Sequence, residues 1–159
     1  MSVRSKKQLS LHVLKKFRII YGSVRQHFRE VEQSCGVTGS QLWIIKEVAN
    51  TPGIGVSVLA ERLSIHQSTC SQLVEKLESR KLIVKQRSSK DQRRVGLRLT
   101  AEAVKLVKLA PGPAQGLLPE TISALSAETI QSLDTSLEKV IRQLQIRNEK
   151  LAEKPLSDL

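Results

Sequence analysis

Five short, uncharged side chains that form hydrogen bonds cluster at the start of one predicted helix. They are Gln67, Ser68, Thr69, Ser71 and Gln72. Hydroxyl and amide groups donate as well as accept, so they can contact base edges or phosphate oxygens of a nucleic acid. The alternative is a local role, because Ser and Thr are also common as helix caps and on solvated helix faces.

A second polar group lies in the stretch SSKDQRRVGLRLT, residues 88–100, where basic side chains surround a single acid. The group consists of Lys90, Asp91, Arg93 and Arg94. Arginine suits a narrow minor groove, which concentrates negative potential. Asp91 would repel a phosphate, so we expect it to form a salt bridge with Arg93 that directs the guanidinium. We expect further phosphate contacts from Lys76 and Arg87.

The elements that position these groups follow from hydrophobic spacing. Apolar residues three and four apart predict helices over 9–34, 41–50, 57–63 and 67–80, with Ser40 as a possible cap of the second. A three-residue turn separates the last two, which makes residues 57–80 a helix–turn–helix. In such a unit the second helix enters the major groove of DNA.

The basic group then falls in the loop of a hairpin. Strands are predicted at 82–87 and 95–99, because apolar and polar residues alternate in the second. A helix after Thr100 must break at Pro111-Gly112-Pro113. The last helix is predicted over about 127–152, where apolar residues recur with a rhythm close to seven.

Composition narrows the class of protein. The chain has 159 residues and a net charge of +11, yet residues 111–159 carry seven acidic against five basic side chains. Positive charge confined to residues 1–110 favours a polyanionic partner, with nucleic acid ahead of a membrane surface. No apolar run is long enough to cross a membrane, and two cysteines make no disulfide framework, so we expect a cytoplasmic protein. No enzyme, cofactor or metal signature is present.

The combined pattern predicts a mainly α fold with a small β-hairpin wing, in three parts. Residues 1–35 would form an N-terminal helix that contributes to dimerisation, residues 36–110 a winged helix–turn–helix domain, and residues 111–159 C-terminal dimerisation helices. The first and last helices carry apolar stripes too long for so small a core to cover, which is why we assign them to a homodimer interface.

Two linked motifs resemble the multiple-antibiotic-resistance regulators, the MarR family of winged helix–turn–helix proteins. They are LAERLSIHQSTCSQLVEKLESRKLI, residues 59–83, and DQRRVGLRLT, residues 91–100. The resemblance implies a homodimeric repressor that binds a pseudo-palindromic operator in double-stranded DNA. It also implies a small, often aromatic or phenolic, effector. Gln72 stands where the family often has arginine, and Lys81 stands where a glycine usually ends the recognition helix.

Two other functions remain open from the sequence alone. One is a winged-helix protein-interaction module whose basic surface binds an acidic protein. The other is a small-molecule sensor with weakened DNA recognition, an idea motivated by Gln72.

Overall fold

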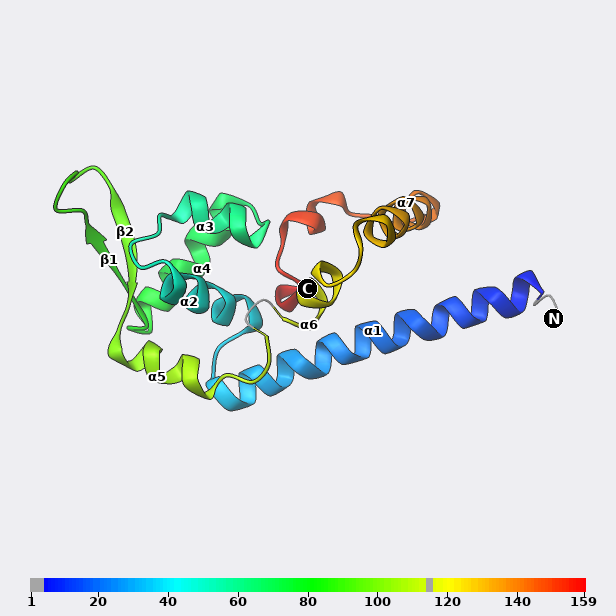
Figure 1. Cartoon of the computed structure of the whole chain (residues 1–159), viewed down its shortest axis with the longest axis horizontal. Helices are drawn as coiled ribbons and strands as arrows, with labels where there is room; N and C mark the ends of the chain where they lie inside the picture. The colour runs from blue at the N-terminus through cyan, green and yellow to red at the C-terminus, as the bar shows by residue number, and fades with distance from the viewer. Residues whose placement is uncertain (1–4, 114–115) are drawn as a thin grey trace.

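The computed structural model describes residues 5–113 and 116–159. Within these ranges the chain is mainly helical, with one two-stranded antiparallel sheet, so the predicted fold class is confirmed (Figure 1). The first elements are α1 (Lys6–Cys35), α2 (Gly39–Asn50), α3 (Val56–Leu63), α4 (Gln67–Ser79), β1 (Ile83–Arg87), β2 (Val95–Leu99) and α5 (Ala101–Leu109). They are followed by α6 (Leu117–Ser123), α7 (Ala127–Gln143) and two 3-10 helices, η1 (Glu149–Glu153) and η2 (Leu156–Asp158).

The winged-helix lobe consists of α2, α3, α4 and the hairpin, and α1 extends away from it as a long rod (Figure 1). Fully buried side chains from its elements form the core of this lobe, among them Ile44 from α2, Leu59 from α3, Leu77 from α4 and Leu97 from β2. Each such side chain contributes about 1.5–3 kcal/mol when it leaves water. The apolar faces that the spacing predicted therefore hold the helix–turn–helix together.

The hairpin is anchored at its root. β1 and β2 pair with Ile83 opposite Leu99 and Arg87 opposite Val95. A Cβ on Gly96 would lie only 2.6 Å from the carbonyl oxygen of Gly53, so this close approach requires glycine. The hairpin is therefore held against the segment before α3, and its loop projects beyond the lobe.

Lys81 ends the recognition helix α4 in the way that a glycine usually does. Its φ is +58°, in the left-handed region. Its N–H donates to the carbonyl of Glu78, and the N–H of Leu82 donates to that of Leu77. These two hydrogen bonds satisfy carbonyl groups at the end of the helix, as they would with a glycine. Because lysine has a Cβ, the left-handed conformation strains the backbone of Lys81.

Ser40 is not the cap of α2, contrary to the sequence prediction. Thr38 takes that position, and its hydroxyl accepts from the N–H of Gln41. Ser40 lies two residues after this cap and is buried; its hydroxyl donates to Asp158 at 2.9 Å and its N–H donates to the hydroxyl of Ser157 at 2.9 Å. The C-terminal residues thus bind the start of α2, and no local sequence pattern predicts this contact.

The last helix is shorter than the predicted 127–152. α7 ends at Gln143, and Leu144 takes an extended conformation. The side chain of Asn148 then caps η1, and Pro155 is buried as the chain returns to α2. Apolar residues recur past Gln143, but the helix does not continue, and the residues after it lead back to the lobe.

Both segments that the sequence analysis assigns to dimerisation expose apolar side chains in the single chain. On α1 these include Phe17 (42% exposed) and Ile20 (46%), and on α7 they include Val140 (45%). α5 ends at Leu109, before the Pro111-Gly112-Pro113 break that the sequence predicted. In the described ranges, no helix combines the length and apolar character that a membrane span needs.

Candidate nucleic-acid interface

The recognition helix α4 has one buried and one exposed face. Cys70, Leu73, Val74 and Leu77 are buried against the lobe. On the other side Gln67, Ser68 and Gln72 are exposed, and Thr69 and Ser71 are half-buried. The structure therefore leaves three of the five predicted polar residues fully available to a partner and two available in part.

His66 is the cap of α4, a role that the sequence analysis did not give it. Its Nδ1 accepts from the N–H of Ser68 at 3.3 Å and lies 2.7 Å from the Ser68 hydroxyl. Histidine is not among the residues that usually cap helices, so composition gave little signal. The position directly before the helix was the only available clue.

The hairpin loop exposes Lys90, Asp91, Arg93 and Arg94, as predicted, but its ion pairing differs from the expectation. The Asp91 carboxylate accepts from the backbone N–H of Arg93 at 3.0 Å, and its ion pair is with Arg94 at 3.8 Å. The expected salt bridge between Asp91 and the Arg93 guanidinium is thus wrong. An aspartate in a turn bonds the backbone two residues on, and this local contact takes the carboxylate oxygen.

A groove of about 1090 Å³ lies between the hairpin and the first turn of α3. Gln67, Arg87 and Arg94 line it together, although they come from separate elements. Lys85 and Arg98 line it as well, and the sequence analysis did not include them in the site. The signal for Arg98 was present, because alternation places it on the solvent face of its strand.

Some basic side chains of α4 and the hairpin form ion pairs, and others do not. Lys85 pairs with Glu78 at 3.2 Å and Arg94 with Asp91. In residues 5–113 and 116–159, no ion pair within 4.0 Å involves Lys76, Arg87, Lys90, Arg93 or Arg98. A surface whose cations are left uncompensated is suited to an anionic partner.

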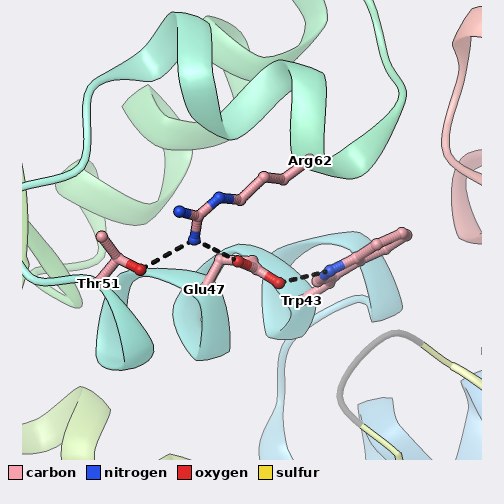
Figure 2. Close-up of polar contacts among 4 residues, drawn as sticks. All are labelled: Trp43, Glu47, Thr51 and Arg62. Atoms are coloured by element: carbon pink, nitrogen blue, oxygen red, sulfur yellow. Dashed lines mark hydrogen bonds and ion pairs between the residues drawn. The ribbon is translucent and has the colours of Figure 1, made fainter.

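A cluster of four polar side chains fixes α3 on α2 (Figure 2). The Arg62 guanidinium donates to Glu47 at 3.1 Å and to the Thr51 hydroxyl at 2.9 Å. The other oxygen of Glu47 accepts from the indole N–H of Trp43 at 3.3 Å. Arg62 lies on α3 and the other three on α2 or its C-cap, so the cluster sets the position of the first helix of the helix–turn–helix.

The two cysteines have different surroundings. Burial raises the pKa of the Cys70 thiol to about 11, in keeping with its place in the core. Cys35 is half-buried at the end of α1, where burial raises its pKa and the Lys46 ammonium opposes that shift. No group of three potential metal ligands occurs among the described residues.

Comparisons with known proteins agree with this arrangement. The family model described as "MarR family" matches residues 36–94. The chain is 24% identical over 127 residues to the HTH-type transcriptional repressor MdtR of Bacillus subtilis. The aligned region covers 79% of this chain and 81% of MdtR. It is 34% identical over 80 residues, half of this chain, to a putative transcriptional regulatory protein for the hcr operon of Thauera aromatica, and spans 48% of that relative.

Solved structures share the fold beyond the lobe. A mutant of MepR from Staphylococcus aureus bound to an oligodeoxyribonucleotide superimposes with a TM-score of 0.52 at 26% identity, covering 84% of this chain and 98% of that chain. The residues matched by the family model include α2, α3, α4, β1 and the hairpin loop described above. Over residues 36–94, which hold the helix–turn–helix, the chain is similar to the MarR family.

Proposed function

We propose that the chain is a transcriptional repressor that binds a pseudo-palindromic operator as a homodimer. The observation that carries this proposal is the exposed polar face of α4 next to a hairpin on which Arg87, Lys90, Arg93 and Arg98 form no ion pair within the described residues. Gln67, Ser68, Thr69, Ser71 and Gln72 would face the major groove. Arg93 would enter the minor groove, and Lys76, Arg87, Lys90 and Arg94 would contact phosphates.

The test is selection from a random duplex pool. A homodimer with one recognition helix per half-site should enrich a two-fold symmetric sequence, with half-sites about one helical turn apart. A basic module that binds an acidic protein would enrich no sequence, even at low salt. Enrichment of a palindrome therefore decides between the two functions.

We further propose that residues 1–35 and 111–159 form the dimer interface, with residues 36–110 as the DNA-binding domain. The exposed apolar side chains of α1 and α7 support this division, because a second copy of the chain would remove them from water. Residues 1–4, 114 and 115 lie outside the described ranges.

The interface can be tested on α1. Phe17→Glu places a charge on the apolar stripe and should give a particle of the 17.7 kDa chain mass, where the unaltered chain gives twice that mass. Gln33→Glu makes the same charge change on the other side of the helix and should leave the dimer intact. Light scattering after gel filtration measures both, and a Phe17→Glu dimer of unchanged affinity would contradict the assignment.

A small aromatic or phenolic effector is part of the proposal on the strength of the family resemblance. Titration of simple phenolic acids against the complex with the selected operator tests it. An effector should release the DNA at a concentration that leaves the fold intact. A compound that binds the chain in the absence of any selected operator would instead favour a sensor with weakened DNA recognition.

A further inference from the structure

The side chain of His66 holds both polar groups of Ser68, the second residue of the recognition helix. Nδ1 accepts from the Ser68 backbone N–H, so this ring nitrogen carries no proton. The Ser68 hydroxyl lies 2.7 Å from the same nitrogen. In the tautomer that this backbone contact selects, Nδ1 offers only a lone pair, and the Ser68 hydroxyl donates its proton to it.

This pairing limits what Ser68 can do with DNA. A serine hydroxyl has one proton and two lone pairs, and here the proton is already used. In the major groove the remaining lone pairs can accept from the amino groups of cytosine and adenine. They cannot bond guanine O6 and N7, thymine O4 or a phosphate oxygen, which are themselves acceptors.

The backbone of His66 is fixed as well. Its N–H donates to the carbonyl of Glu153 at 3.2 Å, and its carbonyl accepts the first bond of α4 from Cys70 at 3.0 Å. Ser64, in the turn before it, takes a left-handed conformation. The imidazole therefore extends from a turn that is held on both sides.

We propose that His66 is a positioning residue that determines base specificity, by making Ser68 an acceptor for a cytosine or adenine amino group. This inference rests on the proposed function and deepens it. Ser68 is exposed on the face that α4 presents to a partner, so its hydrogen-bonding direction reaches the bound DNA. A family member with a shorter cap at this position would leave the same hydroxyl free to donate.

The experiment measures relative affinity for all four bases at every position of the selected operator. In the unaltered protein, one base pair per half-site should favour cytosine or adenine on the contacted strand by roughly fivefold, the scale of one neutral hydrogen bond. Ser68→Ala should abolish that preference and leave the other positions unchanged.

His66→Ser is the decisive variant. Serine still caps the helix, but its side chain is too short to hold the Ser68 hydroxyl in the same way. The freed hydroxyl can then donate to guanine or thymine, and the preference at the same base pair should fall to within about twofold. His12→Ser makes the same substitution in α1 and should retain the original profile.

Three results would overturn the inference. These are a His66→Ser profile identical to that of the unaltered protein, a Ser68→Ala profile with no altered position, and a guanine or thymine preference at the Ser68-dependent base pair. If the unaltered protein enriches no sequence at all, the proposed function is overturned, and this inference with it. Ser68→Ala keeps the test valid even if His66→Ser fails to fold.

Discussion

The Asp91 carboxylate holds Arg93 by its backbone N–H, at 3.0 Å, and leaves the Arg93 guanidinium without an ion pair in the described residues. Its ion pair with Arg94 is long, at 3.8 Å, and the two side chains are 49% and 85% exposed. An exposed pair of this kind contributes little. The carboxylate therefore shapes the loop more than it neutralises it.

Two substitutions of Asp91 separate shape from charge. Asp91→Asn keeps an oxygen for the Arg93 N–H and removes the negative charge. It should tighten operator and random-duplex binding alike, by roughly twofold to fivefold at low salt. Asp91→Ala also loses the turn, so the ratio of operator to random-duplex affinity should fall. Fluorescence anisotropy titrations measure both, and equal ratios for the two variants would contradict a role in shaping the loop.

Arg93 should contribute to operator affinity through its charge and its reach. Arg93→Ala should weaken operator binding by roughly tenfold and lower the slope of log affinity against log salt by about 1. Lys105→Ala removes one positive charge from α5, at the root of the hairpin, and should leave the slope unchanged. If Arg93→Ala behaved like Lys105→Ala, the assignment of the hairpin as a DNA-contacting wing would be wrong.

The sequence predicted the lobe well because its signals are local. Leucine, isoleucine and valine at helical spacing located α2, α3 and α4, and alternation located β2. The sequence prediction failed where contacts with a segment distant in sequence determine the local structure. The Ser40 hydroxyl donates to Asp158, and α7 ends at Gln143, after which the tail returns to α2. Neither feature produces a periodic pattern of residues in the sequence.

In the candidate site, too, local sequence patterns predicted some features and missed others. Residue types and charge located the polar face of α4 and the basic loop. The hydrogen-bond partners within them were not predictable, because they depend on where single atoms lie. Asp91 bonds the backbone of Arg93 and not its guanidinium, and His66 caps a helix for which serine or threonine would be expected.

The two thiols should react at very different rates. The thiolate is the reactive form, and burial raises the pKa of both thiols, that of Cys70 to about 11. At pH 8 a disulfide reagent should modify Cys35 more slowly than free cysteine, and Cys70 only through unfolding. The raised pKa of Cys70 also predicts a stability contribution that is full below pH 9 and is lost as the pH rises towards 11.

Mass spectrometry after timed labelling checks this prediction. Cys35→Ser should abolish the slow native reaction and leave the second thiol protected until denaturant is added. Equal labelling of both thiols in the native protein would contradict the buried position of Cys70. Rapid oxidation of Cys35 with release of the operator would show a redox role that its raised pKa does not favour.

Lys81 offers a stabilising substitution, because its φ of +58° strains any residue with a Cβ. Lys81→Gly removes that strain, about 1–2 kcal/mol, and loses part of the gain because glycine makes the unfolded chain more flexible. We expect a net increase of about 0.5–1 kcal/mol in the free energy of unfolding. Lys81→Ala removes the same charge and keeps the Cβ, so it should show no such gain. Urea denaturation followed by circular dichroism compares them, and a destabilised Lys81→Gly would mean that the lysine side chain itself supports the end of α4.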